Sequence, residues 1–412
     1  MPFAAVISAS ATLDHGDGPL RATLVFAGQT LVEYQARQAA QAGAGHISIH
    51  VNAITPPLSR SVDRLNADGI SVSLVRTPAE LRQTIPPDTD ILLIGDGVIA
   101  AQSLYAEMAR HSAPVLLTVN ERIKEPGFER IDAQYRWAGL ARLNFRQLMD
   151  TVHTLDLLAD WDLQSTLLRH AVQAGAGRLP VEDEALFGGA IVLIDTQAAA
   201  DAAEKKFLPA QSTSAEGQGW VEHYIFRPIA ERTAPWLLRQ QIQPRHLRIG
   251  AMVTAAIALI IASYGLTWPA IALFLAALAA ENISNILAHV TRRPERFSWR
   301  AYICPALALL GLAVLGSHWR VNRIADQFAG LHLCASILIV ELAIRRGRAG
   351  KLKSWAICSL GVALLLLLLF RLMGLLDFGF ALVTLYALGT IGLMLLRRPE
   401  VRSRSAPSKE TA

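Results

Sequence analysis

An acidic residue follows a wholly apolar run in the first half of the chain. Asp96 comes two positions after Ile91–Ile94 and stands between Gly95 and Gly97. If the run is a buried strand, the carboxylate lies at the strand end. There it can hold Mg²⁺ against a phosphate, because this ion takes one or two carboxylates together with phosphate oxygens. Gly-Asp-Gly is also typical of a turn, so a metal site and a plain turn both stay open.

A second group of polar residues lies within a long apolar segment of the second half. Helical spacing places the group on one face, and its members are Glu281, Ser284, Asn285, Ala288 and His289. Polar groups in a membrane helix usually face the bundle interior or a wet cavity and often mark function. Ser and Asn also form hydrogen bonds between helices, so spacing alone does not separate a functional site from helix packing.

The elements that would position Asp96 alternate between strands and helices. The expected strands are Ala4–Ser8, His46–Val51, Gly69–Val75, Ile91–Ile94, Val115–Val119, Ala133–Gly139 and Leu186–Ile194. The expected helices are Thr30–Ala42, Glu80–Thr84, Ala101–Arg110, Asn144–Asp150, Val152–Ala159 and Leu163–Ala174. This alternation predicts a doubly wound α/β sheet, in which ligands bind beyond the carboxyl ends of the strands.

The elements that would position Glu281 are apolar and long enough to cross a bilayer. Six segments are expected, at Leu247–Leu266, Pro269–Val290, Tyr302–Trp319, Gln327–Ile344, Trp355–Leu376 and Phe378–Leu396. Lys and Arg gather before the first segment, in alternate loops and after the last one, so both termini are predicted to be cytoplasmic. Met1–Leu13 has no basic segment and no clear cleavage site, which favours a cytoplasmic α/β domain. The expected location is a bacterial inner membrane.

Composition supports this division. Of the 412 residues, 52% are apolar and 18% are charged, which excludes a disordered chain and a uniformly soluble enzyme. Before residue 215 the chain has 17 basic and 24 acidic residues, and after it 22 and 10. Because the basic excess flanks apolar runs, it indicates membrane-flanking residues rather than nucleic-acid binding. Cys304, Cys334 and Cys358 lie far apart, so we expect neither a disulfide framework nor a zinc site.

Four regions are therefore predicted. Residues 1–210 form the α/β domain, and residues 211–246 form a linker and a juxtamembrane amphipathic helix. Residues 247–396 form the all-α, six-helix transmembrane bundle, and residues 397–412 form a basic cytoplasmic tail.

The first region resembles the nucleotidyltransferases that activate sugar or polyol phosphates with a nucleoside triphosphate. The resemblance lies in the opening strand, in Phe26–Gly43, and in Leu92–Asp96, which is similar to the metal-binding strand end of that family. It implies nucleotide-binding roles for Ser8, Ser10 and Arg21 and a metal-binding role for Asp96.

The loop after the first strand departs from that family. The family's Gly-rich turn presents backbone N–H groups to the phosphates, whereas this chain has Ser8-Ala9-Ser10-Ala11-Thr12-Leu13. Without glycines, Cβ atoms crowd the turn where phosphate must approach. Turnover of a nucleoside triphosphate is therefore not expected.

The second half resembles the CDP-alcohol phosphotransferases. That family's hallmark is D-x2-D-G-x2-A-R-x8-G-x3-D-x3-D, whose aspartates hold two metal ions. In this register the four aspartates have become Glu281, Ser284, Tyr302 and Ala306. Asn285, His289 and Ser298 replace the two glycines and the arginine, and Ala288 is retained.

One carboxylate cannot hold two Mg²⁺ ions, so phosphotransfer at the usual place is not expected. Glu295 lies in a predicted loop and Glu341 lies two membrane segments further along the sequence, so we expect no alternative acid cluster near Glu281. As a candidate metal ligand Glu281 therefore stands alone.

Together the two halves resemble bifunctional enzymes that make a CDP-polyol, such as CDP-inositol, and then transfer it to a second alcohol. The missing motifs favour a catalytically inactive, membrane-anchored relative that acts as a scaffold or regulator. A divergent active transferase of polar-lipid synthesis and a nucleotide-binding membrane sensor remain as alternatives. The expected partners are the lipid bilayer, a nucleotide or CDP-alcohol, and either a second copy or an active paralogue. Mg²⁺ is expected only if the protein is active.

Overall fold

The chain forms two compact units in the computed structural model. The first consists mainly of Met1–Gln211, and the second contains most of the chain that follows. The structure describes residues 3–13, 18–122, 128–157, 162–182, 186, 189–211, 218–240, 243–292, 300–318, 329–346 and 352–396.

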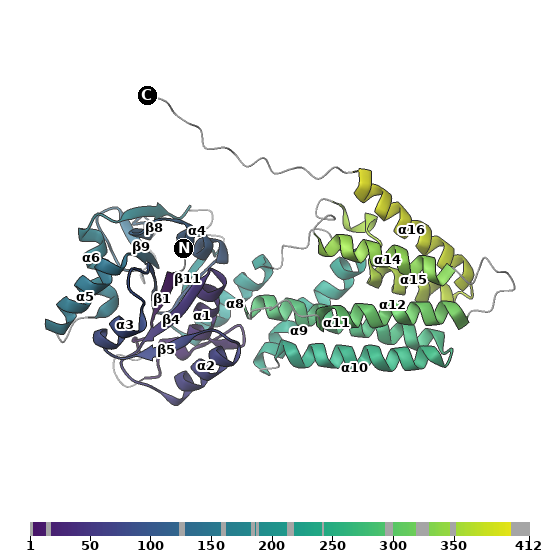
Figure 1. Cartoon of the computed structure of the whole chain (residues 1–412), viewed down its shortest axis with the longest axis horizontal. Coiled ribbons are helices and arrows are strands. Elements are labelled where there is room, and N and C mark those ends of the chain that lie inside the picture. Colours follow the sequence, from purple (N-terminus) through teal and green to yellow (C-terminus); the bar gives the residue numbers. More distant parts are fainter. Residues whose placement is uncertain are drawn as a thin grey trace, which may run out of the picture. The chain divides into compact units, whose positions relative to one another are not determined.

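A seven-stranded sheet forms the centre of the first unit (Figure 1). Its strand order is β10 (Gly177–Pro180), β8 (Val115–Asn120), β9 (Tyr135–Leu143), β6 (Ile91–Ile94), β1 (Phe3–Ser8), β4 (Ala44–His50) and β5 (Val72–Val75). The strands run parallel except β9, which is antiparallel to both β6 and β8. The sheet is therefore mixed, with one antiparallel strand among six parallel ones.

Helices cover both faces of this sheet. Period-2 alternation in β1 sends Ala5 and Ile7 to one face and Ala4 and Val6 to the other. The first face packs against α1 (Leu31–Gln41), α2 (Pro56–Ala67) and α4 (Gln102–Arg110). The second packs against α3 (Pro78–Thr84), α5 (Phe145–Leu157) and α6 (Leu163–Gln173). The predicted doubly wound α/β arrangement is confirmed in this respect.

Local signals explain where the elements begin. Thr30 and Glu33 form a reciprocal capping box at the start of α1, and the expected helix there is confirmed.

Several elements differ from those predicted. The helix α2 was not predicted. The two helices expected over Asn144–Ala159 are one, α5. The strand expected over Leu186–Ile194 is the short β11 (Ile191–Leu193), which pairs with β7 (Val98–Ala100) and not with the main sheet. The helix α8 (Gln197–Gln211) follows.

The second unit is helical. Its elements are η2 (Glu222–Phe226), α9 (Arg227–Arg239), α10 (Pro244–Ser263), α11 (Thr267–Val290), α12 (Arg300–His318), α14 (Ala329–Arg345), η3 (Ser354–Ala356), α15 (Leu360–Leu372) and α16 (Leu376–Leu396). Close packing depends on glycines: a Cβ added at Gly311 would lie 2.2 Å from the ring of Phe274. Gly316 of α12 faces Gly330 of α14, where an added Cβ would lie 2.9 Å from the other Cα. Small residues let membrane helices approach in this way.

Three helices are long and apolar enough to cross a membrane: α10, α11 and α16. Shorter apolar helices lie at Tyr302–Gly316 and Leu360–Leu372. The described residues thus contain three candidate spans where six were expected. The predicted tail 397–412 and residues 212–217 of the predicted linker lie outside the described ranges.

In α10 the small side chains are buried and the large apolar side chains are exposed, which is the reverse of the arrangement in a soluble protein. Its buried face carries alanines, namely Ala251, Ala255, Ala258 and Ala262. Its large apolar residues point outward, with Ile249, Val253, Ile257 and Ile260 between 47% and 58% exposed. Large exposed apolar faces are unfavourable in water and are expected against lipid.

Candidate functional site

Asp96 stands at the carboxyl end of β6 between two glycines in confined positions. Gly97 has φ +74°, and a Cβ there would lie 2.5 Å from both Arg21 Cδ and the Ile194 carbonyl oxygen. A Cβ on Gly95 would lie 3.1 Å from the ring of Trp137. The Gly-Asp-Gly sequence therefore fixes Asp96 between β6, Arg21 and Trp137.

The carboxylate of Asp96 is buried and partly hydrogen-bonded. Its Oδ2 accepts a hydrogen bond from the backbone N–H of Ala11 at 2.8 Å, and the backbone N–H of Ser10 also donates to this carboxylate. Burial raises the pKa of Asp96 to about 6, although these N–H groups and the positive charge of Arg21 lower it. Near neutral pH, the group is therefore easily protonated or deprotonated.

The three nucleotide-binding candidates predicted from the sequence surround Asp96. Ser8 at the end of β1, Ser10 and Arg21 line one cavity of about 410 Å³ together with Asp96. The structure therefore brings these four residues to one cavity. Their roles as nucleotide or metal ligands stay predictions.

Two atoms in this cavity lack hydrogen-bond partners within the described part of the chain. They are Oδ1 of Asp96, whose residue is 8% exposed, and Nε of Arg21. An unpaired buried polar atom costs free energy, on the order of 1–3 kcal/mol. An acceptor and a donor thus remain for a ligand.

The sequence did not point to three further polar residues at this cavity: Glu129, Asp162 and Gln164. Asp162 is the N-cap of α6 and accepts a hydrogen bond from the Ser165 N–H at 3.0 Å. Gln164 accepts a hydrogen bond from the backbone N–H of Asp96 at 3.1 Å. Burial raises the pKa of Glu129. An N-cap pattern before Leu163 was the one signal available, and it indicated a helix rather than a site.

The loop after β1 uses its own backbone donors. Ala11 and Ser10 donate to Asp96, Ala9 donates to the His50 carbonyl at 2.9 Å, and Leu13 donates to the Pro19 carbonyl at 3.1 Å. A phosphate-binding loop needs such N–H groups to be free for the ligand. Along the described part of this loop, the donors are already engaged within the protein.

The polar face predicted in the second unit lies on α11 and is mostly buried. Ser284 is 0% exposed and donates to the Pro244 carbonyl at 2.8 Å, and Asn285 Oδ1 accepts from Arg248 at 3.0 Å. Glu281 and Ala288 are also buried, whereas His289 is exposed. Ser284 and Asn285 therefore join α11 to the start of α10, as interhelical hydrogen bonding requires.

The remaining positions of the hallmark register do not join Glu281. Tyr302 is 40% exposed and its ring lies under the guanidinium of Arg345, 4.4 Å from ring centroid to Cζ. Ala306 is exposed on α12. Ser298 lies outside the described residues.

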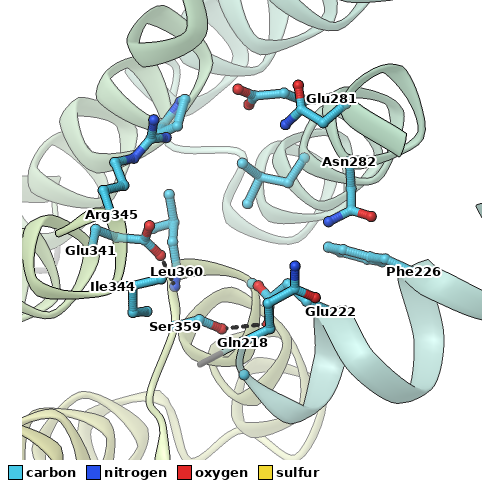
Figure 2. Close-up of a pocket in the computed structure, with 15 residues that line it drawn as sticks. Gln218, Glu222, Phe226, Glu281, Asn282, Glu341, Ile344, Arg345, Ser359 and Leu360 are labelled. Atoms are coloured by element: carbon cyan, nitrogen blue, oxygen red, sulfur yellow. Dashed lines mark hydrogen bonds between the residues drawn. The ribbon is translucent and has the colours of Figure 1, made fainter. Parts of the chain in front are cut away.

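Two acids that are distant from Glu281 in the sequence line the same cavity in the structure. A cavity of about 130 Å³ is lined by Glu281 of α11, Glu341 of α14 and Glu222 of η2, with Asn282 and Arg345 (Figure 2). Glu341 is distant in sequence, but α12 packs against α14, and Gly311 of α12 lies against Phe274 of α11, so Glu341 reaches the same cavity. Sequence spacing carried no sign of this convergence.

Two of these carboxylates cap the start of α15. Glu222 accepts a hydrogen bond from the Ser359 hydroxyl at 2.6 Å and another from the Gly361 N–H. Glu341 Oε1 accepts from the Leu360 N–H at 2.9 Å. Carboxylates stabilise a helix N-terminus because they satisfy its free N–H groups and its partial positive charge. Figure 2 shows both side chains directed at Ser359 and Leu360.

The acids in this cavity are not arranged as a metal centre. Within the described ranges, no three or more His, Cys, Asp or Glu side chains lie close enough to hold a metal ion. Glu281 instead accepts a hydrogen bond from the Cys304 thiol and interacts with the charges of Arg345 and Arg248. Neither the two-metal arrangement nor a relocated equivalent fits these residues.

Comparisons with known proteins give fold likeness only. No protein-family model matches the chain, and no curated protein matches it. A Bacillus anthracis structure described as a glucose-1-phosphate thymidylyltransferase is similar at 10% identity and a TM-score of 0.38, with 49% of this chain and 94% of that chain covered. The CTP:phosphocholine cytidylyltransferase of Streptococcus pneumoniae is similar at 12% identity and a TM-score of 0.36, with 50% and 99% covered. The chemistry of the site is therefore inferred from its own residues.

Proposed function

We propose that the protein is a catalytically inactive, membrane-anchored relative of enzymes of CDP-alcohol and polar-lipid synthesis, and that it acts as a scaffold or regulator. The observation that carries this proposal is the hydrogen bond from the Ala11 N–H to Asp96. This hydrogen bond occupies the N–H group of Ala11, which a phosphate would need as a donor. It also occupies one oxygen of the Asp96 carboxylate, which a metal ion would need as a ligand.

The helical unit supports the same proposal. The position of the second hallmark aspartate is Ser284, whose hydroxyl is bound to the Pro244 carbonyl. Glu222 and Glu341 cap α15 and are engaged in structure rather than in a metal centre. The apolar outer face of α10 suits a bilayer, and we propose six membrane segments with both termini in the cytoplasm.

Calorimetry on the full-length protein in nanodiscs tests the proposal. Mg²⁺ with CTP and a polyol phosphate, and separately Mg²⁺ with a CDP-alcohol and an acceptor alcohol, are titrated while release of pyrophosphate or CMP is followed. The proposal expects neither product above the rate in empty nanodiscs. Saturable release of either product would establish the alternative of a divergent transferase, and loss of pyrophosphate release in Asp96→Asn would assign that step to the α/β unit.

Ligand binding without turnover is the second candidate function. The unpaired Oδ1 of Asp96 and Nε of Arg21 favour it, because both line a cavity with room for a small molecule. In this case the protein is a membrane sensor whose α/β unit reports ligand occupancy. Co-purification of an active homologue would instead favour the scaffold.

A further inference from the structure

The unpaired atoms of the α/β cavity restrict what can bind there. Asp96 Oδ1 can only accept a hydrogen bond when ionised, and Arg21 Nε can only donate one. A phosphate oxygen satisfies Arg21 but not Asp96, and an ammonium group satisfies Asp96 but not Arg21. A hydroxyl group both donates and accepts, so a ligand with several hydroxyls satisfies both atoms.

The charge of the lining also bears on the ligand. The cavity is lined by three carboxylates, Asp96, Glu129 and Asp162, and by one guanidinium, Arg21. Asp162 interacts repulsively with both other acids. A phosphorylated ligand would add negative charge to a site with an acidic excess, and repulsion between like charges grows as water is excluded. A neutral ligand does not meet this cost.

The walls and the volume suit a compact polyol. The space is about 410 Å³, and the amide of Gln164 and the hydroxyls of Ser8 and Ser10 add neutral polar groups to the lining. Trp137 also lines the cavity, with its ring beside Gly95. An aromatic ring gives an apolar surface for the C–H face of a sugar or cyclitol, while the polar groups bind the hydroxyls.

We infer that the α/β unit binds an unphosphorylated, uncharged polyol or sugar between Asp96 and Arg21, without nucleotide or metal. This inference rests on the proposed function, because it names the ligand to which a non-catalytic regulator would respond. The contacts that engage the loop donors leave Oδ1 of Asp96 and Nε of Arg21 without partners, and both residues line the cavity.

The test is calorimetry of the full-length protein in phosphatidylglycerol nanodiscs, in buffer free of glycerol and of sugar detergents. The probes are glycerol, myo-inositol and glucose, each compared with its phosphate monoester, in the presence of a chelator. We expect saturable binding of at least one neutral probe and at least tenfold weaker binding of the matching phosphate.

Two variants locate the site. Arg21→Met removes the Nε donor. In Asp96→Asn the amide oxygen keeps the Ala11 contact and the NH₂ replaces the free acceptor by a donor. Each should weaken the neutral probe at least tenfold. Asp63→Asn and Arg82→Met are matched controls, because both residues are exposed and lie outside the cavity lining. They should bind as the wild type does.

Three outcomes would overturn the inference: no neutral probe binds, a phosphate monoester binds more tightly than its neutral partner, or the controls lose binding equally. Thermal unfolding of each variant shows whether a loss of binding reflects misfolding. Competition between two probes for the wild-type protein tests whether they share one site, and it needs no variant. Pyrophosphate release with Mg²⁺, CTP and a polyol phosphate is measured separately. Turnover in that assay would contradict the proposed inactive scaffold. Absence of polyol binding would contradict only the inference that the ligand is a neutral polyol or sugar.

Discussion

The carboxylate of Asp96 and the backbone N–H of Ala11 lie 2.8 Å apart although 85 positions separate them in the chain. The contact ties the loop after β1 to the end of β6 at the edge of the sheet where α/β proteins bind ligands. Because Asp96 is buried, this pair determines both how the loop is held and how the site responds to pH.

The stability of the first unit should depend on pH through Asp96. Burial raises its pKa from 3.8 to about 6, so the folded state binds this proton more tightly than the unfolded state. The stability from this group is full below about pH 4 and falls as pH rises to about 6; the total loss is about 3 kcal/mol. Asp96→Asn should remove this slope and unfold at a higher temperature than the wild type at about pH 8.

Tryptophan fluorescence during thermal unfolding at several pH values measures this effect, since Trp137 packs beside Gly95. Asp63→Asn is the control, because that carboxylate is exposed, and it should keep the wild-type slope. Equal slopes in wild type and Asp96→Asn would contradict the assignment.

Gly97 should not tolerate a side chain. In Gly97→Ala the added Cβ meets the Ile194 carbonyl oxygen at 2.5 Å, and φ of +74° adds strain. We expect a loss of roughly 2–4 kcal/mol, the sum of overpacking and left-handed strain. Gly175→Ala is a matched control, with φ +71° and nothing within 4 Å, and should lose only about 1 kcal/mol. The difference between their unfolding midpoints isolates the packing effect, and equal midpoints would refute it.

The sequence predicted the elements of the first unit better than the neighbours of its site. Ile91–Ile94 is apolar throughout because both faces of a central strand are covered, so its place and that of Asp96 could be read from the pattern. Glu129 and Asp162 reach the cavity because antiparallel β9 lies between β6 and β8, and no local pattern signals that insertion. Likewise, Glu341 meets Glu281 through helix packing, which spacing along one helix does not encode.

Glu222 should stabilise the helical unit by capping α15. Its carboxylate accepts from Ser359 and Gly361, and hydrogen bonds to charged groups contribute about 1.5–3 kcal/mol each. Burial raises the pKa of Glu222 to about 7, so part of this contribution is lost to the cost of its charge. Glu222→Ala should lower the free energy of unfolding by about 1–3 kcal/mol. Glu231→Ala, which removes an exposed partner of Arg227, should change it by less than about 1 kcal/mol.

A double mutant separates the cap from the space that it occupies. A Cβ at Gly361 would lie 2.5 Å from Glu222 Oε1, so Gly361→Ala should destabilise the wild type. Once Glu222 is truncated, the 2.5 Å contact is gone and Phe226 Cε2 remains at 3.3 Å, so the second substitution should cost clearly less. The free energies of unfolding in urea are compared for the two single variants and the double variant. If the losses of the single variants add up to the loss of the double variant, the two residues do not share this contact.

Restoring an acid at the hallmark position should not restore a metal site. Ser284 is 0% exposed and donates its hydroxyl proton to the Pro244 carbonyl. In Ser284→Asp a carboxylate oxygen faces the Pro244 carbonyl oxygen, so two acceptors meet and a charge is buried. This should lower the free energy of unfolding by roughly 2–4 kcal/mol. Ser284→Ala loses only the hydrogen bond and should cost about 1 kcal/mol. Unfolding midpoints are compared with and without Mg²⁺. Stabilisation of Ser284→Asp by Mg²⁺, absent in wild type and in Ser284→Ala, would mean that Glu281 and its neighbours can still form a metal centre.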